Sequence, residues 1–301
     1  MIQKGALSDK NVILKLFVWL GLILLLTLPM EIIWIAVVGV NASVSSLKIL
    51  QVIQTFVVFI LPALAAVWLW SERPMAWLHL DKGMSWQTAL LVPLMMVMFV
   101  PGINLLSVLN QQVELPAAFA DLEMRLKELE EGMTQLTEQF AYAENVPQLL
   151  LNLIIMAALP AIGEEICFRG TCQGLFTDGT SGPYNYTHLR ARTHVAIWVT
   201  AFLFSAIHFQ FYGFVPRMLL GALLGYLLCY SGSLYVPMLA HFTNNTVAVL
   251  GLYMVGKGVW NEEAVDAFGS GDTLWVGILS LIAGSALLWL FVRRQSSAPR
   301  L

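Results

Sequence analysis

Residues 163–170 read Gly-Glu-Glu-Ile-Cys-Phe-Arg-Gly and lie at the centre of a long apolar run, residues 149–175. An ionisable side chain at membrane depth costs roughly a few kcal/mol, so charges in such a run indicate a functional site. On a helix, Glu165 and Arg169 stand four residues apart and can form an ion pair. Glu164 lies about 100° away around the helix, which leaves its carboxylate free for chemistry. The alternative is a structural ion pair that holds two helices together.

The composition is that of a membrane protein. Of the 301 residues, 58% are hydrophobic and only 12% are charged, whereas soluble domains carry about 25% charged residues. We therefore predict an all-α polytopic membrane protein with the lipid bilayer as its surroundings. The net charge of −3 disfavours a nucleic-acid partner.

The apolar runs predict about eight membrane-spanning helices. They form one integral membrane domain, in which residues 1–145 hold the N-terminal spans and an acidic segment, residues 146–255 the motif core, and residues 256–301 a loop and the last span. The short sixth span carries Gly221 and Gly225, whose spacing predicts close helix packing rather than a function. The predicted spans are residues 16–40, 49–70, 86–109, 149–175, 193–211, 216–230, 234–255 and 274–292.

An acidic segment separates the third and fourth predicted spans. Residues 115–145 carry seven carboxylates, with apolar residues between them at helical spacing. This pattern is typical of an amphipathic helix that lies outside the hydrocarbon. Such a helix is either a solvated connection or a cap over a substrate entrance.

Lysine and arginine residues gather on one side of the predicted spans. By the positive-inside rule, both termini then lie in the cytoplasm and the acidic segment lies outside. The membrane expected is a cytoplasmic membrane of bacterial type. The basic side holds Lys4, Lys10, Arg73, Lys82, Arg190, Arg192, Arg293, Arg294 and Arg300, and the other side holds Lys48, Arg125, Lys127 and Lys257.

Two further predicted spans carry histidines. Phe204 and His208 stand one helical turn apart, and so do His241 and Asn245. These residue types suit hydrolysis of a carbonyl compound. A buried Glu164 is a general base for water, one histidine shares that water, and the other donates with the asparagine to an oxyanion. Glu164, His208 and His241 equally form a catalytic zinc ligand set, although H-E-x-x-H is absent.

The two histidines lie at different predicted depths. His208 falls near the outer end of its span and His241 nearer the inner end, a separation of roughly 10 Å at 1.5 Å per residue. Convergence on one site therefore requires shifted boundaries, or helices that tilt around a wet cavity.

The order of the motifs resembles one known family. Glu-Glu-x-x-x-Arg, Phe-x-x-x-His and His-x-x-x-Asn follow one another on successive apolar helices between residues 149 and 250. Each motif alone is weak, but the ordered set is similar to the CAAX protease and bacteriocin-processing (CPBP) family. This family contains the Ras-converting CAAX endopeptidase and the bacterial abortive-infection-type membrane proteases.

The resemblance implies an intramembrane endopeptidase that hydrolyses a peptide bond near or within the membrane. Its substrate would be a peptide or protein reached from the membrane. The family has been described both as zinc-dependent and as a metal-independent glutamate protease. Asn245 favours the glutamate mechanism, with no cofactor, because an amide is a natural donor and a poor zinc ligand. The implied catalytic residues are Glu164 with His208 for the water and His241 with Asn245 for the oxyanion, and the supporting residues are Glu165, Arg169 and Phe204.

A second hypothesis is a non-catalytic membrane protein, such as a transporter or an immunity factor. Buried carboxylates and histidines also form proton relays. A transporter would favour interrupted spans in two matching halves. Here the polar residues cluster in the fourth, fifth and seventh predicted spans, without a convincing internal repeat.

Overall fold

The computed structural model describes residues 3–39, 42–177 and 189–297. Within these ranges the chain folds into helices, and none of the described residues forms a strand. The prediction of an all-α polytopic membrane protein is therefore confirmed. Arg300, on which the topology prediction partly depends, lies outside the described residues.

Six helical segments are long and apolar enough to cross a membrane, judged by length and composition within the described part of the chain. Two more helices are α12 (Tyr235–Gly256), which coincides with the seventh predicted span, and α10 (Ala191–Ala206), which overlaps the fifth but ends before its predicted end at residue 211. These two helices carry the polar motif residues and are not among the six. A total of eight membrane crossings therefore stays a prediction. The six are α1 (Val12–Val38), α2 to α3 (Val44–Trp70), α5 (Trp86–Gln111), α7 to α9 (Val146–Phe176), α11 (Phe214–Ser231) and η5 with α14 (Gly271–Ser296).

Two of the long segments widen into π-helical turns just before a proline. The first, η1 (Thr55–Ile60), precedes Pro62, and the second, η3 (Leu153–Ala158), precedes Pro160. Proline lacks an N–H and its ring clashes with the carbonyl four residues earlier, and the wider turn absorbs this defect without ending the helix. The other pieces of these segments are α2 (Val44–Gln54), α3 (Leu61–Trp70), α7 (Val146–Asn152), α8 (Leu159–Glu165), η4 (Ile166–Gln173) and α9 (Gly174–Phe176).

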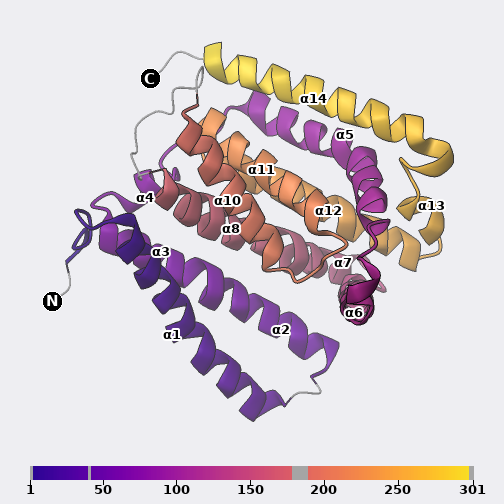
Figure 1. Cartoon of the computed structure of the whole chain (residues 1–301), viewed down its shortest axis with the longest axis horizontal. Coiled ribbons are helices and arrows are strands. Elements are labelled where there is room, and N and C mark those ends of the chain that lie inside the picture. Colours follow the sequence, from indigo (N-terminus) through magenta and orange to yellow (C-terminus); the bar gives the residue numbers. More distant parts are fainter. Residues whose placement is uncertain (1–2, 40–41, 178–188, 298–301) are drawn as a thin grey trace.

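The helices form a bundle whose two edges are visible in Figure 1. At one edge α14 (Leu274–Ser297) runs along α5, and at the opposite edge α1 and α2 project from the rest. Between these edges α10 packs on α11, and α12 contacts α5 as well as η3 and α8. Since α10 also contacts η4, the helices of the second and third motifs both pack against the segment of the first. The connections hold the short helices α4 (Pro74–Trp77), η2 (Ala117–Phe119), α13 (Glu262–Asp266) and η5 (Gly271–Thr273).

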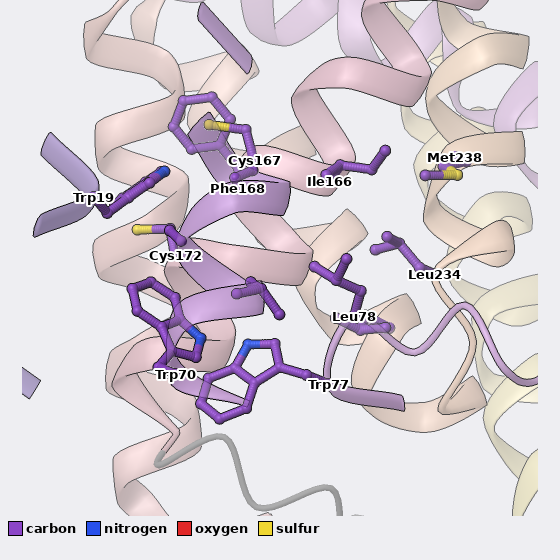
Figure 2. Packing of buried hydrophobic residues seen from close by; sticks show 14 of the residues in the cluster. Trp19, Trp70, Trp77, Leu78, Ile166, Cys167, Phe168, Cys172, Leu234 and Met238 are labelled. Carbon is purple, nitrogen blue, oxygen red and sulfur yellow. The ribbon is translucent and has the colours of Figure 1, made fainter. Parts of the chain in front are cut away.

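A buried aromatic cluster packs η4 against α1, α3 and α4 (Figure 2). Trp70 and Trp77 lie with their ring centroids 5.9 Å apart. Phe168 of η4 meets Phe204 of α10 edge-on at 5.4 Å. Such aromatic pairs add roughly 0.5–1.5 kcal/mol each beyond simple burial. The helix that carries the Glu-Glu-x-x-x-Arg motif is thus held in place by aromatic packing.

Close packing of α11 depends on Gly221 and Gly225. A Cβ added to Gly221 would lie 3.2 Å from Ala201 of α10. A Cβ added to Gly225 would lie 2.7 Å from Gln173 of η4. The bare backbone also supplies acceptors, because Arg169 donates to the carbonyl of Gly221 at 3.0 Å and Gln173 donates to that of Gly225 at 3.2 Å. The predicted packing role of this glycine pair is confirmed.

The acidic segment forms the amphipathic helix α6 (Ala120–Ala141), as its sequence pattern predicts. Its carboxylates lie mostly toward solvent, while Phe140 and Ala141 at its end are buried. Glu130 accepts a hydrogen bond from the backbone N–H of Tyr212 at 3.2 Å, which attaches the helix to the turn before α11. Since α6 also contacts α2, α7 and α12, it lies against the bundle rather than standing free in solvent.

Candidate active site

Glu165 is the buried centre of the motif cluster. Its Oε1 atom lies 2.8 Å from Nη1 of Arg169 and 2.9 Å from Nδ1 of His241. The predicted ion pair is therefore present, and it extends to a histidine of another helix. An ionised carboxylate only accepts hydrogen bonds, so His241 donates from Nδ1 and leaves Nε2 for another partner.

Arg169 joins the motif helix to its neighbours. Besides Glu165, its guanidinium bonds the carbonyl of Gly221 on α11 and lies 4.4 Å from the ring centroid of Phe204 on α10. Arg169 and Glu165 are both fully buried. Leaving one charge of such a pair without its partner costs roughly 3–5 kcal/mol, so this pair braces the site.

Glu164 has different surroundings from its neighbour in sequence. Its Oε2 atom is buried and has no hydrogen-bond partner in the described part of the chain. The same atom lies 3.9 Å from Nε2 of His241, which is too far for a direct hydrogen bond. The Glu164 carboxylate is therefore available for proton transfer, whereas Oε1 of Glu165 is occupied by Arg169 and His241.

His208 lies just beyond the end of α10 at Ala206. Phe209 adopts a φ of 53°, a left-handed conformation that commonly ends helices. Nδ1 of His208 lies 2.7 Å from the carbonyl oxygen of Phe204. A carbonyl only accepts, so Nδ1 carries the proton and Nε2 carries a lone pair. The Phe204 ring centroid lies 5.2 Å from that of His208 and 5.8 Å from that of His241, so the two histidines flank it despite their predicted difference in depth.

Asn245 follows His241 by one turn of α12. Its Oδ1 atom accepts a hydrogen bond from Nδ2 of Asn244 at 3.3 Å. This bond uses the acceptor of the Asn245 amide and leaves its Nδ2 donor for a ligand. Asn244 therefore orients Asn245, a role that the sequence motif does not reveal.

The four catalytic candidates line one cavity of about 560 Å³, whereas Glu165 and Arg169 are not in its wall. The acidic helix α6 covers part of this cavity with its apolar face. This position fits the interpretation of α6 as a cap better than that of a solvated connection. The catalytic candidates in the wall are Glu164, His208, His241 and Asn245, and the contribution of α6 is Met133, Leu136, Thr137 and Phe140.

Polar residues of the cavity wall that the motifs did not mark include Arg217, Gln51 and Asn244, besides Gln54 and Thr137. Nη1 of Arg217 and Oε1 of Gln51 are buried without a hydrogen-bond partner among the described residues. Arg217 could have been found, because an ionisable residue inside a predicted span is the signal that marked Glu164. Gln51 gives no such signal, since uncharged polar side chains are common between packed membrane helices.

The alternative zinc ligand set is Glu164, His208 and His241. In the described residues, no group of three or more His, Cys, Asp or Glu side chains is arranged to hold a metal ion. These three residues face a common cavity, but they do not fit a three-ligand site in this arrangement.

The motif region matches a known protein family. Residues 146–247 match the family model described as Rce1-like, type II CAAX prenyl endopeptidase Rce1-like. Among curated proteins, the chain is similar to uncharacterized protein YpbD of Bacillus subtilis (strain 168), with 29% identity over 100 residues. That alignment covers 32% of this chain and 43% of YpbD, less than half the length of either protein. No solved structure matches the chain. Over residues 146–247, which contain all three motifs, this integral membrane protein thus matches the Rce1-like family that the order of its motifs predicted.

Proposed function

We propose that this protein is an intramembrane endopeptidase that cleaves a peptide or protein substrate with a glutamate-activated water. The observation that carries the proposal is the buried, unpartnered Oε2 of Glu164 in a cavity shared with His208, His241 and Asn245. The Rce1-like match supports a CAAX-type membrane protease at the level of the family. An apolar cover over the cavity also suits hydrolysis, because it limits the access of bulk water to the reacting groups.

In the proposed reaction, Glu164 takes a proton from water, and the water oxygen attacks the carbonyl carbon of the scissile peptide bond. His208 accepts from this water at Nε2, since its Nδ1 proton is donated to the Phe204 carbonyl. Asn245 donates from Nδ2 to the oxyanion that develops on the carbonyl oxygen. The proton on Glu164 then passes to the leaving nitrogen, the C–N bond breaks, and the products are a carboxyl group and an amine.

His241 contributes to the oxyanion site in its doubly protonated state. A neutral His241 uses its one proton on Glu165, so that Nε2 presents a lone pair. A donor role for Nε2 therefore requires a second proton on the ring, and Nε2 then donates to the oxyanion. In this scheme Glu165 orients His241, as the carboxylate of a hydrolase triad orients its histidine.

The test compares the full-length protein with Glu164→Gln, a variant of nearly the same shape that cannot take the proton. Both are placed in liposomes with a diverse set of synthetic apolar peptides in water enriched in the heavy oxygen isotope. The wild type is expected to produce new C-termini that carry one heavy oxygen, and the variant to produce none. Identical cleavage by both proteins would refute the role of Glu164 as the base, and no cleavage by the wild type would refute the proposal and favour a buried proton relay.

A further inference from the structure

Arg217 places a second positive group in the wall of the proposed catalytic cavity. It belongs to α11, and its side chain lines the same space as Glu164 and His208. Its Nη2 atom donates to Oε1 of Gln210 at 2.6 Å. Its Nη1 atom is buried and has no hydrogen-bond partner in the described part of the chain. One end of the guanidinium is therefore fixed, and the other end has a free donor.

No acidic side chain among the described residues forms an ion pair with Arg217. Glu130 of α6 and Glu164 are near enough to interact with its charge without forming an ion pair, and the Oε2 atom of Glu130 bonds the N–H of Tyr212. Burial raises the pKa of Glu130 above its ordinary value of 4.5, against the opposing effects of the Tyr212 N–H and of Arg217. Glu130 is therefore a weak counter-ion.

A half-buried arginine without a direct ion pair is costly, so its position in the cavity wall indicates a ligand. The planar guanidinium matches a carboxylate, which accepts two hydrogen bonds from adjacent nitrogens. Gly213 in the turn before α11 leaves room for the guanidinium itself, because a Cβ added there would lie only 3.2 Å from Nη2 of Arg217.

We propose that Arg217 is a specificity-determining residue that binds a carboxylate of the peptide substrate. This inference rests on the proposed peptidase function, since it assumes that a peptide occupies the cavity. The carboxylate is either the free C-terminus of a substrate cut near its end or an acidic side chain near the cleaved bond. Both sources present the same group to Nη1, and the experiment below separates them.

Gln51 supports a peptide as the occupant. Its Nε2 atom donates to the carbonyl of Ile155 at 3.3 Å, while its buried Oε1 atom has no partner among the described residues. Two residues of the cavity wall thus have unsatisfied hydrogen-bonding atoms, the acceptor Oε1 of Gln51 and the donor Nη1 of Arg217. An extended peptide supplies both complements, because each residue carries an N–H and a carbonyl.

The experiment measures binding of three fluorescein-labelled apolar pentapeptides to the full-length Glu164→Gln protein in micelles. One peptide has a free C-terminal carboxylate, one has a C-terminal amide, and one has the amide and an internal aspartate. Arg217→Gln in this background should weaken binding of a carboxylate peptide by about 10- to 100-fold, as expected for loss of a hydrogen bond to a charged partner. Binding of the amide peptide should change little.

Arg125→Gln is the matched control, because Arg125 is an exposed cation of α6 outside the cavity wall. Thermal unfolding of each variant reports whether it is folded. Arg217→Lys keeps the charge but not the paired donors, so it should restore binding only in part. In a catalytically active protein, Arg217→Gln should raise KM for the carboxylate peptide more than it lowers kcat.

The outcomes separate this inference from the proposed function. Loss of affinity confined to the C-terminal acid assigns Arg217 to the substrate terminus, and loss confined to the internal aspartate assigns it to a side chain. Equal effects on all three peptides, or no binding of any peptide, overturn the inference. If the wild type cleaves peptides but Arg217 has no effect, the peptidase proposal stands and the inference about Arg217 fails. If binding depends on Arg217 but no peptide is cleaved, the binding site stands and the peptidase proposal fails.

Discussion

Nδ1 of His241 and Oε1 of Glu165 lie 2.9 Å apart, joining α12 to the helix of the Glu-Glu-x-x-x-Arg motif. The same oxygen lies 2.8 Å from Nη1 of Arg169. One carboxylate therefore neutralises the buried cation and orients the histidine that faces the cavity. Its removal should have two consequences that can be measured separately, one on stability and one on turnover.

Glu165→Gln should lower the free energy of unfolding by roughly 3–5 kcal/mol, because Arg169 is left as a buried charge without its counter-ion. Glu164→Gln is the matched control, since it makes the same chemical change one residue away, at a carboxylate whose Oε2 atom has no hydrogen-bond partner among the described residues. Thermal unfolding of the purified variants should place Glu164→Gln close to the wild type and Glu165→Gln well below it. Equal unfolding temperatures for the two variants would show that Glu165 does not hold the cluster.

The double variant Glu165→Gln with Arg169→Met separates the effect of Glu165 on stability from its effect on the orientation of His241. Replacement of both charges removes the unpaired cation and should recover much of the stability. Turnover should stay low, because His241 still lacks a charged partner for Nδ1. Full recovery of turnover would mean that Glu165 acts only through stability.

Substitution of Asn245 distinguishes an oxyanion donor from a zinc ligand. Loss of one oxyanion donor costs about 100- to 1,000-fold in kcat, so Asn245→Ala should fall in this range. Asn245→Asp should be worse, because it places negative charge where negative charge develops. Asn244→Ala, which only frees the orientation of Asn245, should give a smaller loss.

The zinc mechanism predicts the opposite order for the two Asn245 variants, because an aspartate serves as an oxygen ligand. Turnover of both variants is therefore measured with a chelator and after addition of zinc. Activity that the chelator removes and zinc restores, with Asp tolerated better than Ala, would contradict the glutamate mechanism.

Gly225→Ala should destabilise the fold by about 1–3 kcal/mol, the range for overpacking a tight core. The added Cβ would lie 2.7 Å from Gln173 and 2.9 Å from Ile197. Gly251→Ala is the control, since a Cβ at that position of α12 meets nothing within 4 Å. It should be neutral or stabilising by roughly 0.5–1 kcal/mol, because alanine is the better helix former. Similar unfolding temperatures for both variants would argue against the tight α11–η4 contact.

The topology proposal is tested by cysteine labelling in intact cells. The three natural cysteines, Cys167, Cys172 and Cys229, are buried, which keeps the background low. Thr134→Cys on the exposed side of α6 should react with a membrane-impermeant reagent, and Ser296→Cys near the end of α14 should react only after permeabilisation. The reverse pattern would place the termini outside the cell.

The sequence by itself determined the relationships that lie within one helix. Glu165 and Arg169 pair because residues four apart share a helix face, and their bond is present at 2.8 Å. The helical spans could be predicted because a bilayer requires long apolar runs with satisfied backbones. The acidic pattern predicted α6 for a similar reason, since its charges and apolar residues separate to two faces.

Only the tertiary structure decided which faces of the spans meet. Each span is apolar nearly all round, so its pattern does not say which side turns toward which neighbour, and no local rule joins His241 to a carboxylate 76 residues away. Helix contacts depend instead on where small residues allow close approach, as at Gly221 and Gly225. That packing brings His208 and His241 to either side of Phe204, closes α6 over the cavity and leaves Nη1 of Arg217 without a partner among the described residues.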